Sequence, residues 1–157
     1  MSDIRRAAIA GLRAGDVFKA RRSFTRDEVE RFASISKDYN PVHFDPRFAR
    51  ARGFDGLICH GLHVASVATE IGGQLGWLAS GLTVRFRKPV YVGDTVECRL
   101  VVREVGPDGR ATADVVFSNQ RGEVVMSAEM TGIVAGAKER EVMATMVAEN
   151  DPTNPLR

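Results

Sequence analysis

The sequence has few cysteines, no long hydrophobic run and almost no net charge. Its two cysteines, Cys59 and Cys98, are too few for a disulfide framework and suit a reducing cytoplasm. No stretch approaches the roughly 18–20 consecutive apolar residues that cross a membrane. The apolar part of the first 16 residues is too short and too interrupted for a signal peptide. We therefore expect a cytoplasmic protein with no membrane partner.

The small net charge also argues against a nucleic-acid partner. It is +2, and the arginines that cluster at positions 21–22, 26, 31 and 47–52 are diluted by neighbouring acids. We interpret them as a solvated face, part of which is able to meet an anionic ligand such as a nucleotide phosphate. A hydrophobic content of 44% over 157 residues fits one soluble domain with a substantial core.

Helix start signals predict two helices in the first third of the chain. Thr25-Arg26-Asp27-Glu28 is a capping box, so a helix begins there, after a short strand over residues 16–22. Asp45 and Pro46 have the N-cap and first-turn chemistry of a second, short helix over residues 46–52.

Residues 60–76 predict a buried helix. Apolar side chains cover most of its circumference, which is typical of a helix enclosed on most sides. Ala65 and Ala68 are small enough for other elements to approach closely. Glycines at 72, 73 and 76 mark its end.

The second half of the chain predicts antiparallel strands. They are expected over residues 82–90, 95–105, 111–120 and 123–135. Turn signals at 106–109 and 119–122 join the last three, and Pro89 suggests an edge or a bulge. The simplest packing is an α+β domain over residues 1–137, with a curved antiparallel sheet wrapped around the buried helix. The charged tail, residues 138–157, is expected to form a surface helix or to be disordered.

An acid and an imidazole stand five positions apart across a predicted turn. Asn40-Pro41 disfavours helix, so the chain bends there and can bring Asp38 and His43 to one side of a loop. Such a pair can add or remove water across a polarised double bond. Seventeen residues later, Cys59-His60-Gly61 opens the buried helix, whose first N–H groups can face a developing oxyanion. The alternative is an ordinary turn, in which Asp38 caps and His43 packs.

A metal site is a second use for the three histidines, His43, His60 and His63. His60 and His63 have no clear carboxylate partner and lack the i, i+4 spacing of zinc helices, so we expect no metal. Cys59 has a nucleophile's position beside His60, but we interpret it as a small buried cysteine.

The segment from Phe32 to Asp45, with its Asp-x-Asn-Pro-x-His core, resembles the hydratase motif of the MaoC-like, (R)-specific enoyl-CoA hydratases. His60-Gly61 is similar to that family's helix start, and the segment from Lys88 to Thr95 resembles its Pro-Val-x-x-Gly-Asp junction. One buried helix followed by long antiparallel strands resembles the family's hot-dog fold. The resemblance covers roughly residues 15–135. Lys37 departs from it, since many members have Gly there.

The resemblance implies roles for five residues. Asp38 and His43 would be the catalytic pair, and Gly61 would donate its backbone N–H to the oxyanion. Asn40 and Thr69 fall at positions that support or line the substrate pocket. The implied reaction is the reversible hydration of a trans-2-enoyl-CoA to an (R)-3-hydroxyacyl-CoA, with coenzyme A as part of the substrate and no other cofactor.

The predicted single sheet has consequences for assembly, and the same scaffold allows two alternative functions. A single sheet would leave an edge and an apolar face open, so we expect a homodimer or a dimer-based oligomer. An acyl-CoA thioesterase on the same scaffold would direct water at the carbonyl carbon, and the Asp-x-Asn-Pro-x-His arrangement argues against it. A non-catalytic acyl-CoA-binding subunit is the other alternative, and the intact pair with Gly61 argues against that.

Overall fold

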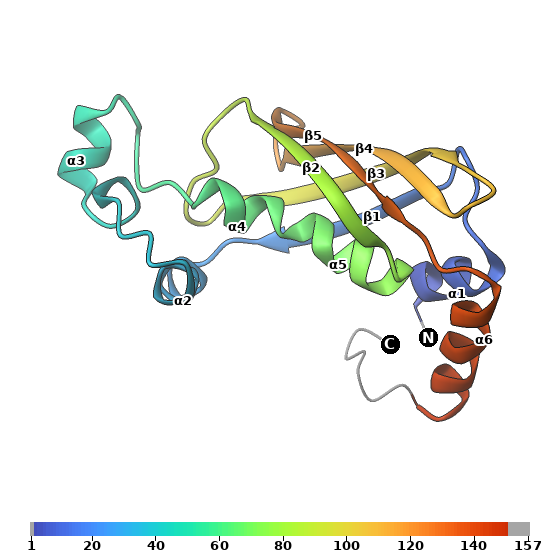
Figure 1. Ribbon diagram of the computed structural model, residues 1–157. Helices are drawn as coiled ribbons and strands as arrows, with labels where there is room; N and C mark the ends of the chain where they lie inside the picture. Colours follow the sequence, from blue (N-terminus) through green and yellow to red (C-terminus); the bar gives the residue numbers. More distant parts are fainter. Residues whose placement is uncertain (1, 151–157) are drawn as a thin grey trace.

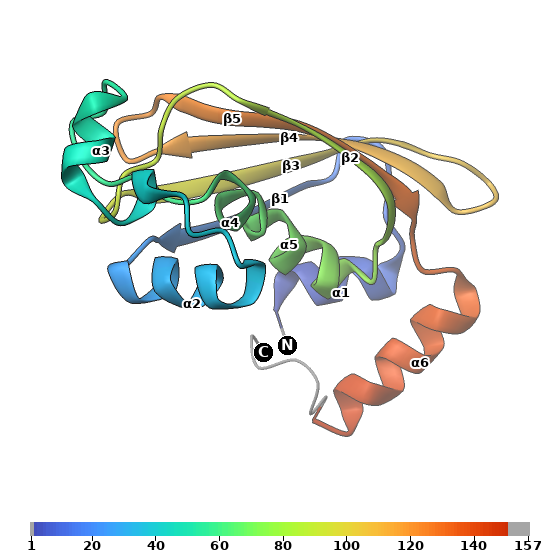
Figure 2. The ribbon, with the colours of Figure 1, turned by 60° about the vertical axis from the view of Figure 1, so that its left-hand side comes forward.

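One antiparallel sheet organises the molecule, for which the computed structural model describes residues 2–150. Its strand order is β1-β3-β4-β5-β2. The bounds are β1 Val17–Ser23, β2 Leu78–Phe86, β3 Thr95–Val105, β4 Arg110–Asn119 and β5 Val124–Ile133. The sheet curves over the consecutive helices α4 (Gly61–Ala65) and α5 (Val67–Leu75), as Figures 1 and 2 show. The predicted α+β architecture is confirmed.

The two edges of the sheet are β1 and β2. Strands β3, β4 and β5 follow one another as hairpins, as the turn signals predict. β1 pairs with the far side of β3, and β2 pairs with β5 from Leu78↔Ile133 to Phe86↔Met126. The chain therefore leaves α5 and enters the sheet at the edge opposite β1.

The core lies between α5 and the concave face of the sheet. On β4 four residues at alternate positions are at most 3% exposed: Ala111, Ala113, Val115 and Phe117. This period of two is that of a strand with one buried face. From α5, Val67, Ile71 and Leu75 fill the opposite side and are fully buried.

The predicted helix over residues 60–76 is interrupted at Ser66. The Ser66 hydroxyl donates to the carbonyl of His63 at 2.6 Å, and the Thr69 hydroxyl donates to the carbonyl of Ser66 at 2.6 Å. Such bonds from side chain to backbone compete with the helical ladder and bend it. The expected end of the helix is confirmed, because Gly76 is its left-handed C-cap, with φ 66°.

The two helices predicted from start signals are confirmed. α2 spans Arg26–Ser36, and the capping box between Thr25 and Glu28 is complete. α3 spans Pro46–Ala51, and the Asp45 side chain accepts from the N–H of Arg47.

The largest differences from the prediction concern β2 and the N-terminal segment. The first long strand begins at Leu78 rather than at residue 82, because the chain turns at Gly76 directly into pairing with β5. It ends at Phe86, so Pro89 lies beyond it. An unpredicted helix, α1 (Asp3–Ala10), packs on α5 and buries Ala8.

The tail contains α6 (Ala137–Ala148), the surface helix that was one of the two expected outcomes. The rest of the predicted tail, residues 151–157, lies outside the described residues. Within residues 2–150, none of the helices has the length and apolar character to cross a membrane.

Ile71→Ala tests the position of the core. Ile71 is fully buried, so its truncation should lower the free energy of unfolding by about 2–5 kcal/mol, the usual cost of such a cavity. Thr69→Ala, at an exposed position of the same helix, is the matched control and should cost under about 0.5 kcal/mol. Urea unfolding at one fixed protein concentration measures both. Equal midpoints for the two variants would contradict the packing described here.

Candidate active site

A chain of local hydrogen bonds shapes the loop after α2. Lys37 is the left-handed C-cap of α2, with φ 62°. Glycine adopts that conformation most easily, so Lys37 holds a backbone position that favours glycine. Asp38 Oδ1 then accepts from the N–H of Asn40, and Asn40 Oδ1 accepts from the N–H of Val42. These bonds start the short 3₁₀ turn η1 (Pro41–His43), which brings His43 back towards Asp38.

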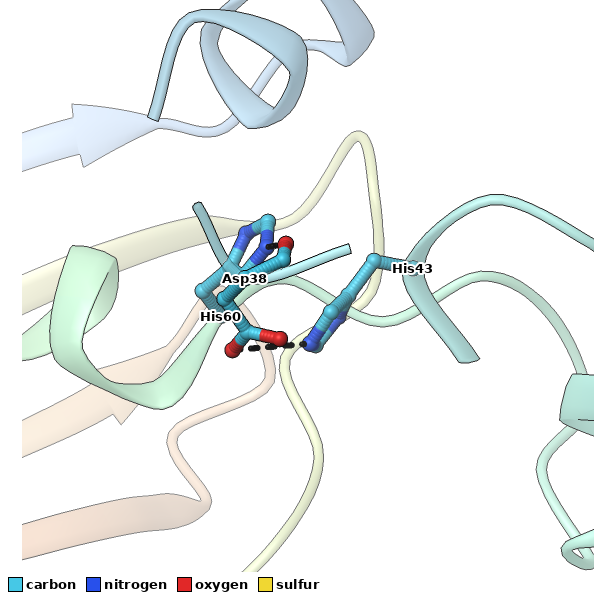
Figure 3. A group of neighbouring side chains, drawn as sticks. All are labelled: Asp38, His43 and His60. Carbon is cyan, nitrogen blue, oxygen red and sulfur yellow. Dashed lines mark hydrogen bonds and ion pairs between the residues drawn. The ribbon is translucent and has the colours of Figure 1, made fainter. Parts of the chain in front are cut away.

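Asp38 and His43 face each other, as predicted. His43 Nε2 lies 3.9 Å from Asp38 Oδ2 (Figure 3). That separation is too long for a direct hydrogen bond and suits a water bound to both groups. The His43 side chain is buried, whereas the Asp38 side chain is half exposed. The imidazole is therefore fixed in protein, and the carboxylate faces the solvent side.

The hydrogen bonds of His43 define its tautomer. Its Nδ1 lies 2.8 Å from the carbonyl oxygen of Ile58. A carbonyl only accepts, so Nδ1 carries the proton and the Nε2 of the neutral ring presents a bare lone pair towards Asp38. Burial lowers the pKa of His43, and nearby His60 lowers it further, against the raising effects of the Ile58 carbonyl and Asp38. The ring is thus a proton acceptor at neutral pH.

His60 completes the cluster. Its Nε2 donates to the main-chain carbonyl of Asp38 at 2.9 Å, and its ring centroid lies 3.8 Å from that of His43. The loop and the helix start therefore exchange bonds, with His43 donating to the carbonyl of Ile58 and His60 donating to that of Asp38. The sequence signal for His60 was its place beside Gly61. Its contact with the loop that carries Asp38 and His43 was not predicted.

The same three side chains form a group with metal-ligand chemistry. Asp38, His43 and His60 each offer one ligand atom, all within 4.8 Å of one another. Two of the four ring nitrogens of His43 and His60 already donate hydrogen bonds to carbonyls. Fewer lone pairs are therefore left to bind a cation. His63 lies outside the group, with its ring stacked on Phe32 at 5.0 Å.

A pocket of about 620 Å³ opens beside the pair. Its lining includes Asp38, His43 and Gly61, together with apolar side chains such as Leu62 and Phe86. Gly61 is the first residue of α4, so its N–H precedes the first helical bond and is not used by the helix. A Cβ on Gly61 would lie 2.5 Å from the Phe86 ring. Glycine is therefore needed for Phe86 to close this side of the pocket.

The two residues predicted to support or line the pocket, Asn40 and Thr69, are both exposed and do not line it. Asn40 shapes the loop through its bonds, and its part in supporting the substrate pocket stays a prediction. Thr69 is exposed on α5 and donates to the carbonyl of Ser66; it is not among the residues that line the pocket. Cys59 does line it, and burial raises the pKa of its thiol to about 12. The interpretation of Cys59 as a small buried cysteine is confirmed.

Comparison with known proteins identifies relatives of this arrangement. The (R)-specific enoyl-CoA hydratase of Aeromonas caviae is 32% identical over 123 residues, covering 75% of this chain and 92% of that protein. The 3-hydroxybutyryl-CoA dehydratase of Methylorubrum extorquens is 30% identical over 128 residues, covering 79% and 82%. A mitochondrial 3-hydroxyacyl-[acyl-carrier-protein] dehydratase of Arabidopsis thaliana is 37% identical over 87 residues, which span about half of each chain.

Solved structures agree with these relatives. The (R)-hydratase of A. caviae superposes with a TM-score of 0.74 at 32% identity, covering 80% of this chain and 98% of that one. An (R)-hydratase of Pseudomonas aeruginosa gives 0.74 at 28% identity, covering 80% and 84%. The fold and its relatives thus define a hot-dog enzyme of the hydro-lyase class, which adds or removes water.

The family follows from the match along the chain. The model of the MaoC like domain matches residues 13–125. The protein therefore belongs to the MaoC-like family, as the Asp-x-Asn-Pro-x-His motif indicated.

Proposed function

We propose that the protein catalyses the reversible hydration of trans-2-enoyl-CoA to (R)-3-hydroxyacyl-CoA. The observation that carries the proposal is the 3.9 Å separation between Asp38 Oδ2 and the bare Nε2 of His43, inside a pocket that Gly61 also lines. The (R) configuration and the coenzyme A carrier are supported by the name of the A. caviae relative.

In this mechanism Gly61 acts on the thioester and the pair acts on water. The Gly61 N–H donates to the thioester oxygen, which makes C3 electrophilic and stabilises the enolate-like charge. A water bound between Asp38 and His43 attacks C3 with its oxygen. Its proton passes to His43 Nε2 while the Asp38 carboxylate orients the water through its second hydrogen. His43 then delivers that proton to C2. The product carries a hydroxyl group on C3 and a new hydrogen on C2, and both side chains return to their starting protonation states.

The proposed reaction needs no metal and no redox cofactor. Each proton is carried by a side chain, and the oxyanion is met by a backbone donor. Coenzyme A enters as part of the substrate. The proposed location remains the cytoplasm, where the two buried, unbridged cysteines would stay reduced.

The exposed edge of the sheet supports a homodimer. β2 carries Leu82 and Phe86 on one face, 45% and 60% exposed, while the register shift between Ala79 and Gly81 puts Leu78, 72% exposed, on the other face. An edge strand with free backbone groups and an apolar face is a surface for pairing with another strand. We propose that a second copy of the chain covers it, since a twofold interface presents the same surface from both partners.

The first prediction concerns the reaction and its pair. The wild-type protein should deplete the enoyl absorbance of crotonyl-CoA without releasing free thiol, and dialysis against EDTA should leave the rate unchanged. Asp38→Asn and His43→Ala should each lower kcat by about 10²–10⁴-fold, the range for loss of a general acid or base. Asp55→Asn, an exposed acid, is the control. Thiol release would instead show a thioesterase, and binding with neither reaction would show an acyl-CoA-binding subunit.

A second prediction isolates the backbone donor. In a Phe86→Ala background, which removes the clash with a new Cβ, Gly61→Ala keeps the N–H and Gly61→Pro lacks it. His60 has ψ 131°, which the residue before a proline adopts readily. The Pro variant should have a kcat about 10²–10³-fold below that of the Ala variant. Equal rates in two folded variants would place the oxyanion donor elsewhere.

A third prediction concerns assembly. Light scattering should give a particle of at least twice the 17.2 kDa chain mass. Leu82→Lys should shift it towards the monomer, because the substitution puts a charge on the β2 face. Val142→Lys, at an exposed position of α6, is the control and should not. An active, monodisperse wild-type monomer would rule the dimer out.

A further inference from the structure

His60 is the one member of the side-chain cluster to which the proposed mechanism gives no part. It is 2% exposed and occupies the N-cap position of α4 without making a side-chain capping bond. Ser, Thr, Asp and Asn are favoured at N-caps because their side chains bond to the first turn. The imidazole at this position therefore has its main contacts elsewhere.

Those contacts join the two halves of the site. The Nε2–H of His60 donates across 22 residues of sequence to the carbonyl of Asp38, at 2.9 Å. One face of its ring lies against His43, with a centroid separation of 3.8 Å and planes tilted by 31°. Figure 3 shows the three side chains together. His60 is also bonded covalently to Gly61, the proposed oxyanion donor.

We propose that His60 is a positioning residue for the hydration pair. Through its bond to the Asp38 carbonyl it holds the loop that carries the carboxylate, and through its ring it fixes the plane of the His43 imidazole. Because Gly61 follows directly, both groups are set at a fixed position relative to the backbone donor. The inference rests on the proposed hydration. A misplacement of about 1 Å in such a site can lower the rate about 10²-fold.

His63 gives the contrasting case of a buried histidine that stacks on Phe32 and interacts with the Glu28 carboxylate rather than with Asp38 or His43. It is also buried, lies on α4 and stacks on Phe32, with a centroid separation of 5.0 Å and an interplanar angle of 10°. No contact between His63 and the rings or carboxylate of the pair is recorded within residues 2–150. It is therefore the matched control for substitution of a buried imidazole in this helix.

Two variants separate the bond from the packing. His60→Phe keeps an aromatic ring against His43 and has no donor for the Asp38 carbonyl. His60→Gln places an amide N–H near the position of Nε2 and has no ring. His60→Phe should lower kcat on crotonyl-CoA about 10–100-fold with KM changed less than about threefold. His60→Gln should recover several-fold of that kcat, and His63→Phe should stay within about twofold of wild type.

The pH dependence of kcat/KM distinguishes a positioning role of His60 from a merely structural one, which would leave that dependence unchanged. Loss of the ring in His60→Gln exposes one face of His43 to water, so the pKa of His43, which burial lowers, rises towards its ordinary value. The acid limb of kcat/KM should then move to higher pH. The other charged groups at His43 are unchanged: the Asp38 carboxylate, and Arg26, which donates to the His43 carbonyl.

Two results of the kinetic comparison would overturn the inference. One is a folded His60→Phe protein with wild-type kcat; the other is a loss of activity that only follows the loss of folded protein in thermal melts. Imidazole ¹⁵N NMR titration of His43 in wild type and His60→Gln gives a measurement that needs no turnover, and identical titrations would also overturn it. If wild-type protein fails to hydrate crotonyl-CoA, the hydration proposal fails, while the NMR comparison still tests the contact between His60 and His43.

Discussion

The site depends on a reciprocal exchange of hydrogen bonds between two segments of chain. The loop at 38–43 donates through His43 to the carbonyl of Ile58, and the segment at 58–60 donates through His60 to the carbonyl of Asp38. Each bond uses a buried imidazole and a backbone acceptor, so neither segment can shift without leaving a buried polar group unpaired. Asp38, His43 and Gly61 are thereby held in one arrangement although they come from separate elements.

The enclosed helix gives this exchange a fixed base. α5 is anchored in the core by Ile71 and Leu75, which are fully buried against the sheet. α4 directly precedes it along the chain, and its first residue, Gly61, follows His60, which bonds to the loop. The sheet also supplies Phe86, from an edge strand, to close the pocket over Gly61. Hydrophobic burial thus places a polar site at the end of the helix, away from the densest part of the core.

Local chemistry explains what the sequence predicted. The capping box at Thr25, the N-cap at Asp45 and the bend at Asn40-Pro41 each act within a few residues, and each is where expected. The strand over residues 95–105 was predicted to the residue. The close approach of Asp38 and His43 is likewise a local feature, because hydrogen bonds within the loop produce it.

Contacts between distant residues explain what was missed. The role of His60 depends on a carbonyl 22 positions away, and no periodic pattern encodes that. The early start of β2 follows from pairing with β5, and α1 is held by contacts with α5 and α6. Thr69 was placed by resemblance alone, whereas its hydroxyl bonds within its own helix on an exposed face.

The buried thiol of Cys59 has a consequence for an enzyme with this proposed substrate. An enoyl thioester is an electrophile at C3, and a thiolate adds to such a carbon as readily as water does under catalysis. Cys59 lines the pocket, yet burial raises the pKa of its thiol to about 12, so the thiol stays protonated at neutral pH. If the proposed enoyl thioester is the substrate, burial keeps the cysteine that lines its pocket in the unreactive thiol form.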